Sequence, residues 1–211
     1  LMGWSIAADR EKFTLQEMIE AFDIDRVSTG EPVFDLVKLI DLNGQYIREM
    51  SEDELVERLL SWRLSKESFR KVMPLVRERM KTLSDFIALG DFFFTGDLDH
   101  KPFAAAMVSK GRTPSETGKI LQEYIEKVDE PWKEARRVPF EDKALEEFSR
   151  TFAEEKGWKV KELFMALRLA VTGKSATPPL FATMEVLGRE LTRKRVRDAA
   201  ETLKALPPPK A

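Results

Sequence analysis

Helix-start signals are the feature that most limits what this 211-residue chain can fold into. Three capping boxes, Thr-x-x-Glu at 14–17, Ser-x-x-Glu at 51–54 and Thr-Pro-x-Glu at 113–116, each precede apolar residues at helical spacing. In such a box a hydroxyl and a carboxylate satisfy the free amide groups of the first helical turn. Helices are therefore expected to begin near residues 15, 52 and 114. Because no useful period-two pattern indicates a strand, the sequence predicts an all-α protein.

Apolar residues three and four positions apart predict further helices at 66–80, 141–156, 159–172 and 189–205. Three prolines follow the last of them, so the tail at 207–211 is expected to be disordered. The segment LGDFFFTGDLDHKPF, residues 89–103, is expected to be an aromatic loop because Gly, Asp and Pro interrupt it. Its three phenylalanines, Phe92 to Phe94, could stack on bases, but packing back onto the core is the favoured interpretation.

The composition excludes several kinds of chemistry. The chain has no Cys and a single His, His100, which excludes disulfides, thiol nucleophiles and structural zinc with Cys ligands. His100 lies in a polar loop and is expected at the surface. Carboxylate pairs occur at helix caps or on polar faces, so we predict no catalytic residue and no metal site. Without a run of 18 apolar residues or a secretory signal, we expect a cytoplasmic protein that does not contact a membrane.

Charge is distributed unevenly although the net charge is only −2. The first quarter of the chain is acidic, whereas residues 63–81 and 186–211 are rich in Lys and Arg. Basic stretches of this kind are compatible with an RNA-facing surface, but solvated helix faces have the same composition. Charge alone leaves both interpretations open.

The segment TGKSATPPLF, residues 172–181, contains Gly-Lys-Ser, the end of a phosphate-binding loop. A Walker A loop needs a Gly five positions before its Lys, after a strand, so that the backbone can wrap around phosphates. Leu169 occupies that position, inside an expected helix. The segment is therefore interpreted as a turn that ends one helix and begins the next, and not as a nucleotide site.

Three longer stretches resemble a known family. LMGWS, FTLQEMIEAFDIDRVSTGEPVFDLVKLIDLNGQYIRE and LRLAVTGKSATPPLFATMEVLGRELTRKRV are similar, in this order, to the carboxy-terminal portion of bacterial glutamyl-tRNA synthetases, the class I glutamate-tRNA ligases. The resemblance covers essentially the whole chain. The family's HIGH-like and KMSKS-like signatures are not found in the sequence. The resemblance therefore implies a portion without the active site, with no cofactor of its own, in an enzyme that uses ATP and Mg²⁺.

The resemblance also implies the domain organisation and the partner. Residues 1–51 correspond to the end of the stem-contact domain, a short helical remnant before a two-part helical cage for the anticodon loop. The two helical subdomains of that cage are expected at 52–104 and 105–211. The implied partner is tRNA(Glu) and not DNA, and the full-length enzyme is expected to be a monomer. Lys38 and Arg48 are candidate contacts with the tRNA backbone, although Asp41 stands where the family often has Trp.

The resemblance places the anticodon site on two segments. Arg79 occupies the position that resembles the family's reader of the third anticodon base. Lys174 is interpreted either as a phosphate neighbour or as a surface lysine. The second wall of the anticodon pocket is implied to consist of Arg168, Thr177, Pro178, Leu180 and Phe181, where Pro178, Leu180 and Phe181 would supply an apolar shelf for an unstacked base.

The chemistry of the bases gives Arg79 a specific expected role. Glutamate anticodons end in cytosine and glutamine anticodons in guanine. Cytosine offers two acceptors on its Watson–Crick edge, which suit the five donors of a guanidinium, whereas guanine presents donors there. We therefore expect preference for tRNA(Glu). One alternative does not use the resemblance. In it, Arg79 is a solvent-facing helix residue, and the chain is a helical protein-interaction module with a basic face and no RNA ligand.

Overall fold

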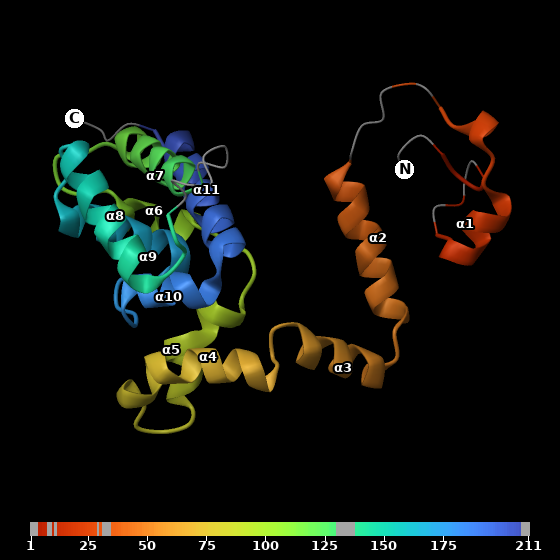
Figure 1. Ribbon diagram of the computed structural model, residues 1–211, viewed down its shortest axis with the longest axis horizontal. Helices are drawn as coiled ribbons and strands as arrows, with labels where there is room; N and C mark the ends of the chain where they lie inside the picture. Colours follow the sequence, from red (N-terminus) through yellow and green to blue (C-terminus); the bar gives the residue numbers. More distant parts are fainter. Residues whose placement is uncertain are drawn as a thin grey trace. The chain divides into compact units, whose positions relative to one another are not determined.

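The computed structural model describes residues 4–7, 10, 12–28, 30, 35–129 and 138–207. Within these ranges the regular elements are helices and no extended sheet is formed, so the expected all-α class is confirmed. The α-helices, drawn in Figure 1, are α1 (Leu15–Ala21), α2 (Leu36–Glu49), α3 (Glu52–Trp62), α4 (Lys66–Val76), α5 (Asp85–Phe94), α6 (Ala104–Met107), α7 (Pro114–Val128), α8 (Asp142–Glu155), α9 (Val160–Thr172), α10 (Leu180–Leu187) and α11 (Arg189–Ala205). Short 3-10 helices are η1 (Ile24–Arg26), η2 (Arg77–Arg79) and η3 (Lys101–Phe103).

The chain divides into two compact units, Leu1–Trp62 and Arg63–Ala211. The boundaries expected at 51 and 104 concern the domains of the family and stay predictions. No described helix is long and apolar enough to cross a lipid bilayer.

The first unit contains α1, η1, α2 and α3. The expected capping box begins α1, because the hydroxyl of Thr14 accepts from the amide of Glu17 and the Glu17 carboxylate accepts from the amide of Thr14. Lys12 forms an ion pair with Glu49 of α2, which ties the start of the unit to that helix. The described helices of this unit bury no residue completely.

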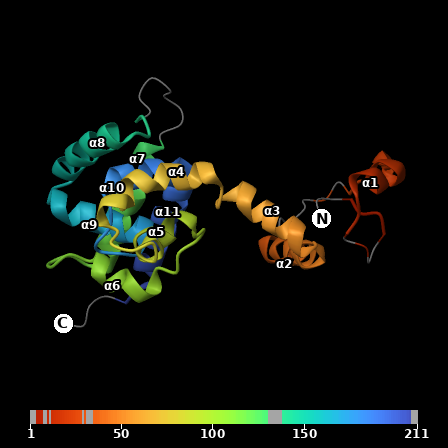
Figure 2. The same cartoon turned by 90° about the horizontal axis from the view of Figure 1, so that it is seen from below.

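The second unit contains the main hydrophobic core, in which α7 and α11 lie against each other in both views (Figure 1 and Figure 2). A glycine permits this close approach, since a Cβ atom on Gly118 of α7 would lie 2.8 Å from the carbonyl oxygen of Ala200 of α11. A second apolar cluster is built on α4 and α5, with buried Val72, Val76, Phe92 and Phe93 at its centre. Leu187, at the end of α10, packs against both clusters.

Arg195 of α11 joins the two clusters. Its side chain is completely buried, with an exposed fraction of 0%. The guanidinium donates to the carbonyls of Phe92 (2.9 Å), Thr95 and Gly96 (3.0 Å) at the end of α5, and to that of Val171 (2.6 Å) in the last turn of α9. These carbonyls have no partner in their own helices, so the arginine satisfies acceptors that burial would otherwise leave unpaired. Burial lowers the pKa of Arg195 to about 10, at which the group remains charged near neutral pH.

The helix boundaries expected from periodicity are confirmed for most of the second unit. The helices expected at 141–156, 159–172 and 189–205 are α8, α9 and α11, and the capping box at 113–116 begins α7. The helix expected at 66–80 ends earlier, because the chain tightens after Val76 into the 3-10 helix η2. Of the tail expected to be disordered, residues 208–211 lie outside the described residues.

Two expectations about the segment 89–103 are wrong. Its first six residues belong to α5 and not to a loop. This half of the helix is apolar on nearly every side, so its sequence has no periodic apolar face. The expected packing of the phenylalanines onto the core is correct for Phe92 and Phe93, which are buried. His100 is also buried, with 2% exposed, and donates from Nε2 to the carbonyl oxygen of Ala170 at 2.9 Å.

Replacing the fork-shaped donor of Arg195 by a point charge should destabilise the second unit. In Arg195→Lys the charge stays, but one ammonium cannot reach carbonyls at the ends of two helices. We expect a loss of about 2 to 4 kcal/mol in the free energy of unfolding, measured by urea denaturation. Arg197→Lys, on the same helix but without these bonds, is the control and should change the free energy of unfolding by less than about 0.5 kcal/mol. Equal values for the two variants would contradict the role assigned to Arg195.

The stability of the protein should decrease as the pH falls through the range in which histidine titrates. Burial lowers the pKa of His100 below its ordinary value of 6.5, so the unfolded chain binds a proton more readily than the folded chain. The contribution of the neutral ring to stability is therefore complete above that value and is lost progressively below it. Because His100 is the single histidine, this pH dependence is assigned to it.

The measurement is urea denaturation between about pH 7.5 and about pH 5.5, above the range of most carboxylates. His100→Gln keeps an N–H donor for Ala170 but does not titrate, so its stability should vary less over this range. A variant as pH-dependent as the unmodified chain would assign the effect to other groups.

Candidate nucleic-acid interface

The turn between α9 and α10, residues 173–179, is held by its own hydrogen bonds. Gly173 ends α9 in the left-handed region, with φ of 70°. The hydroxyl of Thr172 donates to the carbonyl of Arg168 at 2.7 Å and accepts from the amide of Lys174 at 3.1 Å. Pro179 then precedes the first residue of α10. The sequence expectation of a turn that ends one helix and begins the next is confirmed.

Two guanidinium groups from distant segments converge on this turn. Arg79, the last residue of η2, donates from Nη1 to the carbonyl oxygen of Thr177 at 2.6 Å. Arg168, one turn before the end of α9, donates from Nη1 to the hydroxyl of Thr177 and to the carbonyl of Pro178 at 3.0 Å. The two residues expected to share a site are therefore brought together, although they lie on different helices.

The convergence leaves positive charge without local compensation. Among the described residues, both guanidinium groups donate hydrogen bonds to carbonyl and hydroxyl oxygens, and none of these acceptors is a carboxylate. Burial lowers the pKa of Arg168, and the positive charge of Arg79 lowers it further, which indicates how close the two cations are. Arg79 is exposed and Arg168 is half-buried, and each uses only Nη1 in these bonds. Their remaining N–H groups can donate to an electron-rich ligand.

The four other residues expected in the pocket wall lie beneath this surface. Thr177 is 6% exposed, Leu180 4% and Phe181 3%, and Pro178 is also buried. The ring of Phe181 packs edge-on against that of Phe164, with centroids 4.8 Å apart. In this structure these side chains hold the start of α10 in the core and do not form an exposed shelf. The contact of these side chains with a base stays a prediction. The backbone oxygens of Thr177 and Pro178 accept hydrogen bonds from Arg79 and Arg168 and so orient the two cations.

Lys174 links the turn to α5. Its ammonium group donates to the carbonyl oxygen of Ala88 at 2.7 Å and forms an ion pair of 2.6 Å with Asp91. Neither interpretation from the sequence, a phosphate neighbour or a surface lysine, included this link to α5, and a contact of Lys174 with phosphate stays a prediction. The link places the turn beside the middle of α5.

Lys38 and Arg48 lie on α2 of the first unit, and both are exposed. Their contacts with a tRNA backbone stay predictions.

An exposed apolar tip near Arg79 was not found from the sequence. Leu83 is 89% exposed and Ile87, four residues later, is 66% exposed. The turn that carries Leu83 is rigid, because the carboxylate of Asp85 accepts from the amides of Lys81 (2.7 Å) and Thr82 (2.8 Å). These bonds lower the pKa of Asp85. Leu83 lies between Thr82 and Ser84, and an apolar residue between these turn-forming residues was the available signal.

The described residues do not suggest a metal centre. No group of three or more His, Asp or Glu side chains in this part of the chain is arranged to hold a metal ion.

Comparisons with known proteins indicate the family of the chain. The anticodon binding domain family matches residues 54–200. The glutamate-tRNA ligase of Stutzerimonas stutzeri is 36% identical over 202 residues, which cover 96% of this chain and 39% of that protein. The glutamate-tRNA ligase of Pseudomonas aeruginosa is 36% identical over 203 residues, with the same coverage.

Solved structures give the same result. The crystal structure of a glutamate tRNA ligase from Elizabethkingia meningosepticum, in complex with its amino acid, is 29% identical with a TM-score of 0.55, and the match covers 97% of this chain and 40% of that one. Glutamate-tRNA synthetase from Elizabethkingia anophelis is 25% identical with a TM-score of 0.51. The chain thus spans about two fifths of the length of the relatives it matches.

A methyl group on Gly173 should destabilise the turn more than a methyl group on another glycine of the same conformation. Gly173 and Gly157 have φ of 70° and 65°, so alanine is strained at both, by about 1 kcal/mol. Only at Gly173 would the new Cβ atom lie 3.1 Å from the ring of Phe103, whereas nothing lies within 4 Å at Gly157. We expect Gly173→Ala to lose about 1 to 3 kcal/mol more than Gly157→Ala by urea denaturation. Similar losses of stability in Gly173→Ala and Gly157→Ala would show that the turn accommodates the methyl group beside Phe103 without additional destabilisation.

Proposed function

Since the chain belongs to the glutamate-tRNA ligase family and carries its anticodon-binding domain at residues 54–200, we propose that it binds the anticodon arm of tRNA(Glu) for such a ligase. The formation of glutamyl-tRNA from ATP, glutamate and tRNA, with Mg²⁺, is assigned to parts of the enzyme outside these 211 residues, because the family's nucleotide-binding signatures are not found in them. The proposal includes a cytoplasmic, monomeric full-length enzyme. A helical protein-interaction module without an RNA ligand is not favoured by the comparisons.

The observation that carries the proposal is the pair of guanidinium groups on one turn. Arg79 and Arg168 are oriented by the oxygens of Thr177 and Pro178, and their free N–H groups form a cluster of donors with positive charge. A splayed cytosine presents O2 and N3, both acceptors, to such donors. Guanine presents N1–H and N2–H on the same edge, so donor would face donor.

This difference is large enough to select a tRNA. Leaving buried donors unpaired costs about 1 to 3 kcal/mol, which corresponds to about a tenfold to hundredfold preference for cytosine as the third anticodon base. Leu83 and Ile87 add an apolar surface near Arg79 on which an unstacked base can rest, and such contacts contribute about 1 to 3 kcal/mol per base without selecting its identity. Affinity and selection are thus supplied by different residues.

Arg79→Gln in the full-length ligase should remove most of the preference for cytosine. Glutamine carries one acceptor and two donors, so its amide can pair with either base, whereas the guanidinium has donors only. We expect the ratio of kcat/KM for tRNA(Glu) to kcat/KM for a tRNA with guanine at the third anticodon position to fall from about 10–100 to below about 3.

Arg77→Gln is the matched control. Arg77 lies in the same 3-10 helix and is exposed, but it makes no bond to Thr177. This variant should weaken the binding of both tRNAs equally and keep their ratio. An unmodified enzyme that charges both tRNAs equally well, or an Arg79→Gln enzyme that keeps the preference, would refute the proposed role of Arg79.

A further inference from the structure

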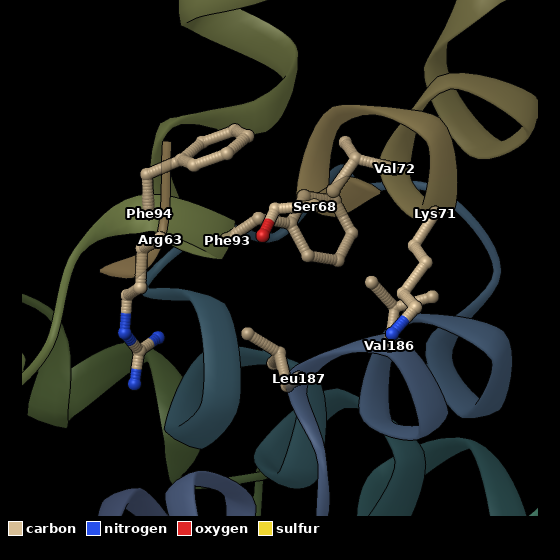
Figure 3. Close-up of a pocket in the computed structure, with 8 residues that line it drawn as sticks. All are labelled: Arg63, Ser68, Lys71, Val72, Phe93, Phe94, Val186 and Leu187. Carbon is tan, nitrogen blue, oxygen red and sulfur yellow. The ribbon is translucent and has the colours of Figure 1, made fainter. Parts of the chain in front are cut away.

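A cavity of about 170 Å³ lies in the second unit, away from the turn that holds Thr177. Figure 3 shows it between the start of α4, the end of α5 and the last turn of α10. Arg63 and Lys71 lie on opposite sides of it in this view, with the hydroxyl of Ser68 between them. The lining residues are Arg63, Ser68, Lys71, Val72, Phe93, Phe94, Val186 and Leu187.

The floor of the cavity is apolar and fixed by the core. Val72 is 2% exposed and Phe93 6%, and both belong to the buried cluster of α4 and α5. Phe94 is held by its ring contacts with Phe69 and Phe86, with centroids 4.9 Å and 5.7 Å apart. A floor built in this way exists before a ligand arrives, so binding does not require the core to be reorganised.

The rim carries positive charge. Two of the lining side chains are cations, one is a hydroxyl, and none is a carboxylate. Lys71 forms an ion pair with Glu67 at 2.8 Å, but both groups are mostly exposed, and a surface pair of this kind contributes less than about 1 kcal/mol. Arg63 lies close to the buried guanidinium of Arg195, and its positive charge lowers the pKa of Arg195 further. An anionic group is therefore favoured at this rim.

We propose that this cavity binds one pyrimidine nucleotide of an unpaired RNA strand, with its base against the floor formed by Phe93 and Phe94 and its phosphate on Arg63 and Lys71. The size supports a single ring, because an engineered cavity of about 150 Å³ accommodates benzene. The aromatic floor offers a stacking partner to any base, and the cations and the Ser68 hydroxyl offer donors to phosphate oxygens.

The proposal rests on the proposed function for the source of the strand, which is the anticodon arm of tRNA. Ser68 and Lys71 precede Arg79 by eleven and eight residues, or about 13 to 18 Å at 1.5 Å per residue along α4 and 2.0 Å per residue along η2. At about 3.4 Å per stacked nucleotide, this separation corresponds to four or five nucleotides. The cavity therefore receives a nucleotide that flanks the anticodon triplet and not a base of the triplet itself.

The test uses the complete 211-residue chain and uridine 5′-monophosphate, followed by NMR chemical-shift titration. We expect shifts of the amides of Phe93 and Val186, and binding about tenfold tighter than for uridine or for inorganic phosphate alone, because either one uses half of the site. Arg63→Gln and Lys71→Gln should each weaken the binding of the nucleotide about tenfold. Arg70→Gln, which removes an exposed cation from the same helix outside the cavity lining, is the matched control and should have no effect.

Each other outcome overturns the inference. Equal affinity for uridine and its monophosphate would show that the cations do not hold the phosphate, and equal affinity for inorganic phosphate would show that the floor does not hold the ring. Shifts of the same amides by a hexaglutamate peptide, but not by the nucleotide, would assign the cavity to an acidic protein. An equal effect of Arg70→Gln would reduce the result to general attraction of anions. Thermal unfolding of every variant shows whether it is folded. If Arg63→Gln or Lys71→Gln fails to fold, the other of these two variants decides whether a cation holds the phosphate.

Failure of this inference is distinguishable from failure of the proposed function. If the enzyme prefers tRNA(Glu) but the chain does not bind the nucleotide, only the cavity assignment is wrong. If the nucleotide binds but the enzyme has no preference for cytosine, only the role of Arg79 is wrong.

Discussion

The second unit depends on one buried cation. Arg195 reaches from α11 to the free carbonyls at the ends of α5 and α9, where helix dipoles concentrate partial negative charge. The end of α9 leads directly into the turn that carries Thr177, and the end of α5 supplies Phe93 and Phe94 of the cavity. One side chain therefore joins the segment that leads into this turn to the segment that lines the cavity. His100 satisfies the adjacent carbonyl of Ala170 in the same way, but as a neutral donor.

The same type of interaction recurs at the turn between α9 and α10. Arg79 and Arg168 are oriented by carbonyl and hydroxyl oxygens, as Arg195 is, and not by carboxylates. A carboxylate would fix a guanidinium equally well but would neutralise it, whereas a carbonyl supplies orientation and leaves the charge. This distinction is important in a chain whose net charge is −2, because general attraction cannot bring a polyanion to it. The proposed binding of RNA then relies on the local positive charge of Arg79 and Arg168.

The sequence predicted the features that depend on residues close to one another in the chain. Capping boxes and periodic faces located the starts of α1, α3 and α7 and the extents of α8, α9 and α11, because a helix end is determined by residues three or four positions apart. The failures concern groups whose surroundings come from distant segments. Arg195 lies in a basic helix that the sequence could not distinguish from a solvated face, and its carbonyl partner in Phe92 is 103 residues away. His100 is buried by a partner 70 residues away. The pairing of Arg79 with Arg168 came from the family resemblance, since no local pattern connects them.

The early end of α4 explains why Arg79 can reach the turn at all. In a continuous α-helix, Arg79 would be rotated by about 300° from Val76, whereas in a 3-10 helix residues three positions apart are eclipsed. The tightened turn η2 therefore gives Arg79 a direction that differs from the one that a continued α4 would give it. Val72 and Val76 of α4 belong to one buried cluster, and Val72 also lines the cavity. Repacking of Val76 would therefore disturb the 3-10 turn from which Arg79 reaches the carbonyl oxygen of Thr177.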